Sequence, residues 1–320
     1  MIYRKLGRTG LTVSIVGFGA SPLGAEFGKI DPAEGKRAVD YAIDHGINYF
    51  DVAPYYGRTL AEERLGAFLQ GKRDRVILAT KVGRYQYGGV DFDYSRQRVL
   101  RSVDESLQRL RTDWIDVIQV HDIEFGDRRQ IIEETLPALL DLKKTGKVRF
   151  VGITGYPLHQ FVDIIQHVPI DTVLTYCRYN LFDTSMDDIL TPVAKAAGVG
   201  LINASPLHMR VLTEKGAPDW HPAPKRVLET GRRVAAFCRE RGVDIADLAM
   251  QFALAHEDVA TTLVGMSKVR HVQMNIRAIG VKPDPELLAQ VREIIAPVAN
   301  VVWMEGRPEN NDPGAVPKRS

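Results

Sequence analysis

Short apolar runs alternate with longer amphipathic segments along the whole chain. The short runs are rich in Val and Ile, which is typical of parallel strands that are covered on both faces. We predict eight strands on this basis. They are Ser14–Phe18, Ile47–Asp51, Val76–Thr80, Asp116–Val120, Arg149–Ile153, Thr172–Leu174, Gly200–Ala204 and Thr262–Val264.

A helical pattern follows each predicted strand. In Ser95–Leu110, apolar residues at 99, 103, 107 and 110 recur at three- and four-residue steps, which places them on one helix face. The helices predicted after the strands are Ala33–His45, Ala61–Leu69, Ser95–Leu110, Ile131–Thr145, Leu158–His167, Asp188–Ala197, Arg226–Arg241 and Val269–Ile279. A hairpin at Tyr3–Val13 and two additional helices, Val243–Ala255 and Asp284–Ile295, complete the prediction.

Eight consecutive strand–helix units predict an α/β fold, specifically a (β/α)8 TIM barrel with an N-terminal β-hairpin and two extra helices. A doubly wound open sheet is the structural alternative. Its dinucleotide fingerprint, G-x-G-x-x-G, is missing after the first strand, where Gly17-Phe18-Gly19 is followed by Ala20-Ser21-Pro22. The barrel is therefore preferred.

The chain shows no compositional break that would mark a domain boundary, so residues 1–305 are predicted to form a single domain. Residues 306–320 are polar and rich in Pro, Gly and Asn, which predicts a flexible tail. Two long connections, Gln86–Phe92 and Pro206–Pro224, are predicted to lie at the rim of the barrel and to line a substrate pocket.

Composition narrows the class of protein. The 320 residues include 42 basic and 40 acidic side chains, so no electrostatic signature of nucleic-acid binding stands out. Two cysteines, Cys177 and Cys238, exclude a disulfide framework. No apolar stretch approaches the ~20 residues of a membrane span, and no secretory signal precedes the first strand. A cytoplasmic enzyme is therefore expected, without a metal site and with no indication of its oligomeric state.

Four polar residues mark the candidate chemistry. Asp51, Lys81 and His121 end or directly follow three of the predicted strands, and Tyr56 comes five residues after Asp51. In a parallel α/β fold the carboxyl ends of the strands share one rim, so these side chains are expected to converge. Each of these residues taken alone can have a purely structural role. All four at one rim are a far more specific indication of catalysis.

Together the four side chains form a plausible device for proton transfer. A tyrosine has a pKa of about 10 and needs a nearby cation to act as a base at neutral pH. Lys81 is the candidate cation, Asp51 can orient Lys81, and His121 can hydrogen-bond a substrate oxygen. This supplies the proton half of a carbonyl–alcohol redox step, whereas the hydride half needs a cofactor.

The chain resembles the aldo-keto reductases over roughly residues 6–295. The motifs that carry the resemblance are INYFDVAPYYGRTLAEERLG, LATKVG, WIDVIQVHD, KVRFVGIT, LINASPL and TLVGMSKVRHVQMN. Within that family, VGITGYPL, TYCRYN and ASPLHM make it most similar to the group of L-galactose and L-fucose (D-threo-aldose) dehydrogenases. The resemblance implies that Tyr56 is the general acid/base, with Asp51, Lys81 and His121 in supporting roles.

The resemblance also implies a nicotinamide cofactor, NAD or NADP with NAD favoured, that lies across the barrel mouth. Residues near the ends of the later strands are the expected contacts: Thr154, Tyr176, Ser205, Leu207, Gly265, Ser267, Lys268, His271 and Asn275. Gly265 permits a close approach of the chain to a phosphate. Lys268 and Arg270 can bind a phosphate or face solvent, and both readings stay open.

Three positions depart from the family pattern. Where relatives often have Ser-Asn to hold the carboxamide, this chain has Thr154-Gly155. Tyr176 or Cys177 stands in place of the usual Gln, and Ala204 aligns with the aromatic residue that commonly stacks on the nicotinamide. Tyr176 can supply that stack or be an ordinary core tyrosine.

The expected partner is a small sugar or aldehyde. Several rim residues can stack on the sugar or hydrogen-bond to its hydroxyl groups: Tyr55, Arg84, Tyr85, Asp122, His208 and Trp303. Oxidation of an aldose of the L-galactose or L-fucose type to its lactone is the leading hypothesis. The alternatives are a general aldehyde or ketone reductase, a regulatory barrel that senses nucleotides with little turnover, and a lyase or hydrolase without nicotinamide.

Overall fold

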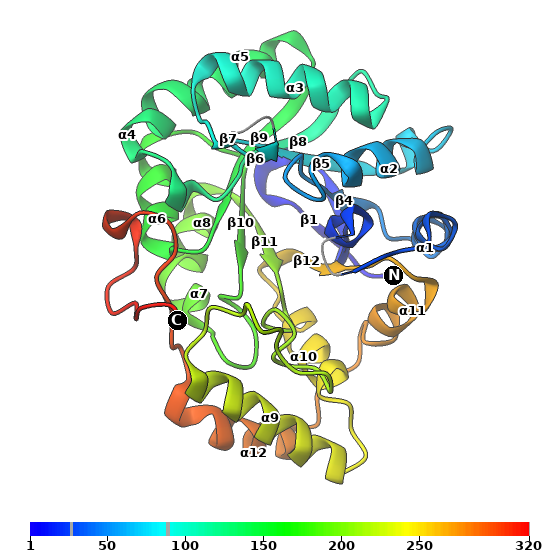
Figure 1. The fold of residues 1–320 in the computed structure, drawn as a ribbon, viewed down its shortest axis with the longest axis vertical. Coiled ribbons are helices and arrows are strands. Elements are labelled where there is room, and N and C mark those ends of the chain that lie inside the picture. The colour runs from blue at the N-terminus through cyan, green and yellow to red at the C-terminus, as the bar shows by residue number, and fades with distance from the viewer. Residues whose placement is uncertain (26–27, 88–89, 320) are drawn as a thin grey trace.

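The structure, a computed structural model, describes residues 1–25, 28–87 and 90–319. Its centre is a closed barrel of eight parallel strands, and the strands follow one another around the barrel in chain order (Figure 1). They are β3 (Val16–Gly19), β4 (Tyr49–Asp51), β5 (Ile77–Val82), β8 (Ile115–Val120), β9 (Val148–Gly155), β10 (Thr172–Tyr176), β11 (Gly200–Ala204) and β12 (Val259–Gly265). The fold is therefore the predicted (β/α)8 barrel.

The strand boundaries differ from the prediction by up to three residues, most at β12, which begins at Val259 instead of Thr262. β3 begins at Val16 because Ser14 already belongs to the N-terminal hairpin, where it pairs with Tyr3. β9 and β10 each run two residues further toward the rim than predicted, as far as Gly155 and Tyr176. Gly155 and Tyr176 therefore belong to the sheet, and the pleat of each strand sets the direction in which these residues point.

The hairpin covers the end of the barrel at which the strands begin. It consists of β1 (Tyr3–Lys5) and β2 (Thr12–Ser14), joined through the 3-10 turn η1 (Gly7–Thr9). Apolar side chains of this segment pack in one cluster with side chains of the barrel strands. The cluster includes Leu6, Leu11, Val13, Tyr49, Ala79, Val117, Leu174, Ile202, Ala260 and Leu263. The barrel interior is thus a filled core, as its Val- and Leu-rich strands require.

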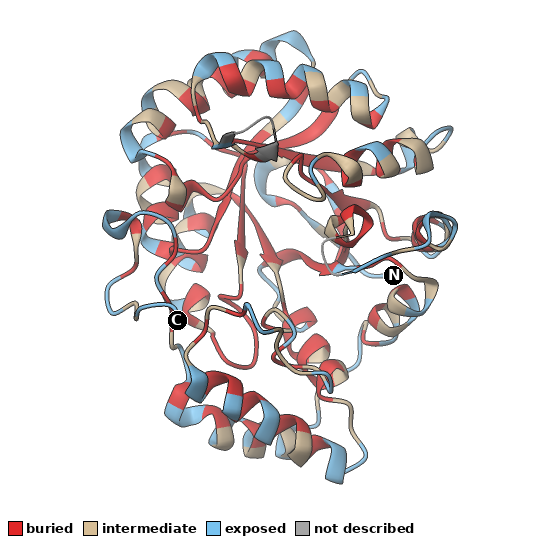
Figure 2. Cartoon of the chain, in the orientation of Figure 1, coloured by how far each residue is buried: buried red, intermediate tan, exposed pale blue. Residues whose placement is uncertain are grey.

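Helices surround the strands and turn their polar faces outward, so the strands are buried while the outer helix faces are exposed (Figure 2). The surrounding helices are α1 (Pro32–Asp44), α2 (Leu60–Phe68), α3 (Arg96–Leu110), α4 (Arg128–Gln130), α5 (Leu136–Thr145), α6 (Leu158–His167), α7 (Ser185–Ile189), α8 (Thr191–Ala197), α10 (Ile245–Leu254) and α11 (Val269–Arg277). A π-helical turn, η5 (Ile131–Thr135), joins α4 to α5. The apolar layer between strands and helices forms the largest part of the core.

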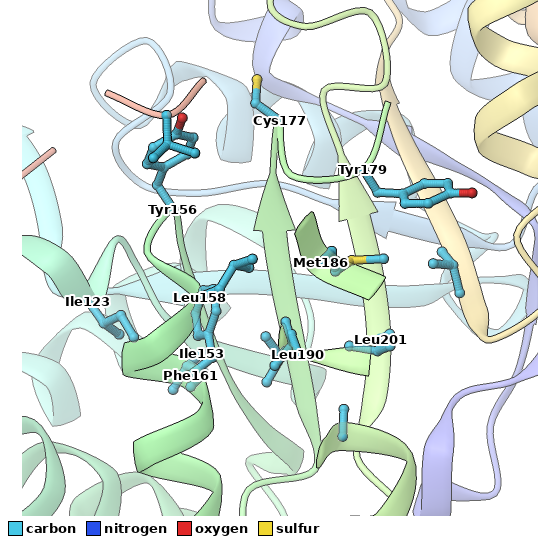
Figure 3. Packing of buried hydrophobic residues seen from close by; sticks show 14 of the residues in the cluster. Ile123, Ile153, Tyr156, Leu158, Phe161, Cys177, Tyr179, Met186, Leu190 and Leu201 are labelled. Atoms are coloured by element: carbon cyan, nitrogen blue, oxygen red, sulfur yellow. The ribbon is translucent and has the colours of Figure 1, made fainter. Parts of the chain in front are cut away.

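This layer is shown from close by in Figure 3. Phe161 of α6 and Leu190 lie among apolar side chains of β9 and β11, such as Ile153 and Leu201. Cys177 lies at the tip of β10, close to the rim. Burial of these apolar side chains, at about 25 cal/mol per Å2 of apolar surface, is the main stabilising contribution to the fold.

The two helices outside the ring are not the pair that the sequence suggested. α9 (Lys225–Glu240) and α12 (Pro285–Ile295) pack against each other, and Figure 1 shows them side by side at one end of the molecule. α10, which we predicted to be an extra helix, packs against β12 as a ring helix. The reason is that α10 is apolar on nearly all sides, so it must be covered on more than one face.

One predicted loop has a regular structure instead. Within the segment expected as the loop Gln86–Phe92, residues 86–87 belong to β6 (Arg84–Tyr87) and residues 90–92 form β7 (Val90–Phe92), and the two strands pair antiparallel. Residues 88 and 89 of that prediction lie outside the described residues. The other predicted rim connection, Pro206–Pro224, contains turns without a helix or strand.

The C-terminal segment, predicted to be a flexible tail, makes buried contacts with the barrel in the structure. Residues 306–319 run back along the barrel beside α6 (Figure 1), and Asn310 and Asp312 are buried. The Asp312 carboxylate accepts hydrogen bonds from the backbone N–H groups of Leu158 and His159 at 3.0 and 2.9 Å and forms an ion pair with Arg178. Because Asp312 satisfies free amides at the start of α6, the polar residues of the tail act as structural contacts.

Cys177 and Cys238 are both buried free thiols. Within residues 1–25, 28–87 and 90–319, no helix is long and apolar enough to cross a membrane. The same residues contain no group of three or more His, Cys, Asp or Glu side chains arranged to hold a metal ion.

Candidate active site

The alternation of side chains along the strands builds a polar layer on top of the apolar interior. Tyr49, Ala79 and Val117 belong to the interior cluster of the barrel. Successive side chains of a strand point to opposite faces, so residues two positions later face the same way. Asp51, Lys81 and Gln119 are these residues, and all three are buried.

Asp51 and Lys81 form a buried ion pair. The Lys81 ammonium contacts Asp51 Oδ1 and also donates to the backbone oxygen of Val52 at 2.9 Å. Gln119 Nε2 donates to the second carboxylate oxygen, Asp51 Oδ2, at 2.9 Å. Both oxygens of Asp51 are therefore engaged, and the carboxylate fixes the direction of the lysine.

Tyr56 reaches the same lysine from a turn after β4. Lys81 Nζ donates to the Tyr56 hydroxyl at 3.3 Å and lies 4.8 Å from the centre of the ring. The turn is held by Gly57, which has a φ of +62° and packs against the backbone of Gly24. A Cβ at Gly57 would lie 2.2 Å from the Gly24 oxygen, so the turn that presents Tyr56 requires glycine.

His121 completes the group at the end of β8. Its ring meets the Tyr56 ring edge to face, with 5.7 Å between centroids. Within the described residues, Nδ1 of His121 is buried without a hydrogen-bond partner, and Nε2 lies 3.7 Å from Asp122 Oδ2. The backbone oxygens of His121 and Asp122 both accept from the Tyr94 hydroxyl, which fixes the chain at this point.

The electrostatic state of the site follows from its burial. Burial raises the pKa of Tyr56 to about 12, although the charge of Lys81 opposes this rise. Burial lowers the pKa of His121 to about 3 against the attraction of Asp122, so its imidazole is neutral near pH 7. Burial by itself disfavours the charged form of Lys81, but Asp51 and Tyr56 outweigh it and raise the lysine pKa. The arrangement can donate a proton through Tyr56 and, in its ionised form, accept one.

Three of the predicted substrate residues gather beside His121. Arg84 forms an ion pair with Asp122 and lies over the Tyr55 ring, with 3.8 Å from the guanidinium to the centroid. Tyr55 in turn meets His121 edge to face at 5.9 Å. Thr154, predicted as a cofactor contact, accepts from the backbone N–H of Asp122 at 3.1 Å.

A second group of predicted residues forms an aromatic row. Trp303 stacks on Tyr156 at 4.6 Å and meets His208 edge to face at 5.5 Å. Tyr176 lies against the other side of this row, 5.3 Å from Tyr156. Trp303 and His208 are fully or almost fully buried, which makes them part of the core beneath the rim.

Tyr85 is not part of either group. Its ring lies under Arg98 of α3 at 3.9 Å, and its hydroxyl accepts from the N–H of Gly83 at 2.9 Å. Adjacent residues of a strand point to opposite faces, so Tyr85 points away from the side on which Arg84 meets Tyr55.

The remaining predicted cofactor contacts lie along the ends of β11 and β12. Ser205 and Leu207 follow β11, and Gly265 ends β12 directly beside Gly19 of β3. Ser267 and Lys268 precede α11, which carries His271 and Asn275. The structure thus places all of them on the side of the rim where these two strands end.

These residues fit a nicotinamide dinucleotide. Gly265 is exposed, and a Cβ there would meet only Pro22, so its surface is open to a phosphate. The N-terminus of α11 lies at the same rim, where its Val269 N–H donates to the Glu34 carboxylate. Near β9 and β10, the buried Oε2 of Glu124 has no hydrogen-bond partner among the described residues, which leaves one polar atom for a bound group.

Sequence reasoning missed two residues of the site. Gln119 carried a usable signal, because it is a polar residue in the otherwise apolar strand IDVIQV, at an inward position. Glu124 carried none, because it belongs to a 3-10 turn, η4 (Ile123–Phe125), whose direction cannot be read from periodicity.

The closed barrel with Asp51, Tyr56, Lys81 and His121 at its rim defines a class of oxidoreductase, and the comparison with known families gives it a name. The chain belongs to the aldo/keto reductase family, whose model matches residues 15–296. The resemblance drawn from the motifs is thereby confirmed.

Two named relatives and one solved structure are similar to the chain over most of its length. The chain is 46% identical to L-galactose dehydrogenase of Arabidopsis thaliana over 317 residues, covering 96% of this chain and 98% of the relative. It is 28% identical to D-threo-aldose 1-dehydrogenase of a Pseudomonas species, covering 89% of this chain and 94% of the relative. The structure superimposes on an aldo-keto reductase of Bacillus halodurans in its holo form with a TM-score of 0.78 and 29% identity, covering 98% and 100% of the two chains.

Proposed function

We propose that this oxidoreductase is an NAD-dependent aldose 1-dehydrogenase that oxidises a sugar of the L-galactose or L-fucose type to its lactone. The observation that carries the proposal is the proton-transfer group at the barrel rim, in a chain that matches L-galactose dehydrogenase over 96% of its length. The likeness to D-threo-aldose 1-dehydrogenase supports a sugar as the substrate class.

In the proposed reaction, Tyr56 in its ionised form takes the proton of the anomeric hydroxyl. Bound nicotinamide would supply the acceptor for the hydride that leaves the anomeric carbon, and the carbon–oxygen double bond of the lactone forms as both leave. Lys81 holds the phenolate through its Nζ, and Asp51 orients Lys81. Neutral His121 offers a ring nitrogen to the sugar oxygen and fixes where it lies.

The preference for NAD over NADP is supported by Glu34 of α1. Its carboxylate accepts a hydrogen bond from the Val269 N–H at 3.0 Å, which places a negative charge at the first turn of α11. Arg37 holds the pKa of Glu34 below its usual range, so the group stays ionised. The 2′-phosphate of NADP, expected beside Lys268 and His271, would meet this charge.

One assay tests the proposal. Absorbance at the reduced-nicotinamide band is followed with NAD and with NADP across L-galactose, L-fucose, D-arabinose, pyridoxal and small aldehydes. We expect NAD reduction with the first two sugars. Pyridoxal is included because a pyridoxal 4-dehydrogenase of Microbacterium luteolum is 31% identical to this chain. No reduction with any sugar would overturn the proposed substrate class.

The matched variants are Tyr56→Phe and Tyr3→Phe. Tyr56→Phe keeps the ring and loses only the hydroxyl, so turnover should fall by about two to four orders of magnitude while nucleotide binding is retained. Tyr3, whose hydroxyl bonds to the Gly46 oxygen far from the rim, is the control and should leave turnover unchanged. Equal turnover in both variants would refute the role of Tyr56.

A further inference from the structure

The carboxyl group of Glu124 is the most unusual polar group outside the four residues already described. It is fully buried in η4, three residues after His121. Its Oε1 accepts a hydrogen bond from the Tyr176 hydroxyl at 3.1 Å, whereas Oε2 has no partner among the described residues. A buried polar atom without a partner is costly, so such an atom near the barrel rim can be satisfied by a bound group.

Glu124 also fills the space of a missing side chain. A Cβ built on Gly155, at the end of β9, would lie 2.4 Å from Oε2 of Glu124. The backbone of Gly155 does not have a positive φ, so it is the Glu124 carboxyl that excludes a larger residue there. This is the position at which the aligned family motif has an asparagine.

Two departures from the family pattern therefore meet at one carboxyl group. Gly155 stands where relatives often have Asn, and Tyr176 or Cys177 stands where they usually have Gln. Of these two residues, Tyr176 is the one whose hydroxyl is bonded to Glu124. Glu124 touches both positions, because Oε2 lies against Gly155 and Oε1 is bonded to Tyr176. A single new side chain has taken the space of the first residue and is oriented by the second.

We propose that Glu124, oriented by Tyr176, binds the carboxamide of the nicotinamide ring in place of the missing asparagine. The inference rests on the proposed function, because it requires that a nicotinamide nucleotide occupies the rim. A primary carboxamide has both a donor and an acceptor, so a carboxyl group can pair with it as well as an asparagine does.

The surroundings of Glu124 define its protonation state. Burial, together with the nearby charges of Asp122 and Glu305, raises the pKa of Glu124 well above its usual range. This direction favours the protonated form of the carboxyl group. Because Oε1 accepts from Tyr176, a proton on the carboxyl group would lie on Oε2, where it can be donated to the carboxamide oxygen.

The C-terminal tail holds Glu124 in place through its backbone. The oxygen of Glu124 accepts from the N–H of Arg307 and from Nδ2 of Asn310, each at 2.9 Å. Asn310 Nδ2 also donates to the oxygen of Gly126 at 3.0 Å. Residues from the far end of the chain thus fix the turn from which Glu124 projects.

The test measures binding rather than turnover. NAD and ADP-ribose are titrated into the protein. The dissociation constant of ADP-ribose divided by that of NAD isolates the contribution of the nicotinamide ring, which ADP-ribose lacks. Glu124→Ala should lower this ratio by about tenfold, since one good hydrogen bond to a buried group is lost. The matched control is Glu309→Ala, which removes an exposed glutamate of the C-terminal tail and should keep the wild-type ratio.

A rescue experiment sharpens the test. Gly155→Asn alone should lower the ratio, because the new side chain would collide with the Glu124 carboxyl. The double variant Glu124→Ala/Gly155→Asn removes the obstacle, supplies an amide at the family position, and should recover most of the ratio. Recovery of this kind supports carboxamide binding, because a merely structural role of Glu124 would not be restored by an asparagine on another strand.

The outcomes separate this inference from the proposed function. If the wild-type protein binds neither NAD nor ADP-ribose, the proposed function fails and the inference fails with it. If Glu124→Ala binds both with the wild-type ratio, only the inference is overturned. If Glu124→Ala binds neither while the wild type binds both, Tyr176→Phe decides: a lowered ratio supports the inference, and an unchanged ratio overturns it.

Discussion

Replacement of Lys81 by Met should separate the stability of the site from its chemistry. Lys81 and Asp51 are buried together, with exposed side-chain fractions of 2% and 5%. Lys81→Met leaves the Asp51 carboxyl buried without its cation. Breaking a buried pair in this way costs about 3–5 kcal/mol of unfolding free energy, because the remaining charge has no compensation.

The effect on chemistry follows from the distance of 3.3 Å between Lys81 Nζ and the Tyr56 hydroxyl. At an effective dielectric constant of about 20, a unit charge at that distance stabilises the phenolate by about 5 kcal/mol. Tyr56 keeps some contact with solvent, so screening reduces this to about 2–3 kcal/mol, or roughly a hundredfold in phenolate population. Turnover of Lys81→Met in the oxidation direction should fall by at least that factor.

The double variant Asp51→Asn/Lys81→Met distinguishes the two effects. It removes both charges, and Asn can still accept from Gln119, so most of the lost stability should return while turnover stays low. Chemical denaturation measures the first quantity, and sugar-dependent reduction of NAD measures the second. Recovery of turnover in the double variant, or wild-type stability in Lys81→Met alone, would refute the account of the ion pair given above.

Two further predictions concern stability. Burial lowers the pKa of both His121 and His208 to about 3 from the ordinary 6.5, so the unfolded chain binds more protons between these values. Stability should therefore be complete above pH 6.5 and fall on acidification, by about 2 kcal/mol per histidine at pH 5, and His208→Phe should flatten the profile of unfolding free energy against pH. Gly57→Ala should unfold more easily than Gly71→Ala, because a Cβ at Gly57 meets backbone at 2.2 Å while one at Gly71 meets nothing within 4 Å. Both have positive φ, which costs about 1 kcal/mol in each, so equal midpoints of thermal unfolding would contradict the role of the Gly57 contact.

The sequence predicted the barrel because each strand is a short apolar run and each helix has a regular apolar face. The same alternation explains why Asp51 and Lys81 could be placed at the rim before their contacts were known. It could not assign α10 to the ring, since an apolar helix of that length packs equally well as an extra layer. It also could not place Glu124 or Tyr85, whose directions are set by a turn and by a neighbouring helix.

The tail packs against the barrel for a physical reason that its polar composition does not reveal. Polar residues predict disorder when they can find no partners except water. Here the turn of η4 leaves backbone oxygens of Glu124 and Gly126 facing inward, and buried oxygens need donors. Asn310 supplies two such hydrogen bonds, and Asp312 accepts from the free amides that begin α6. The tail thus satisfies backbone groups of η4 and the first amides of α6, and its polarity is what allows it to pack there.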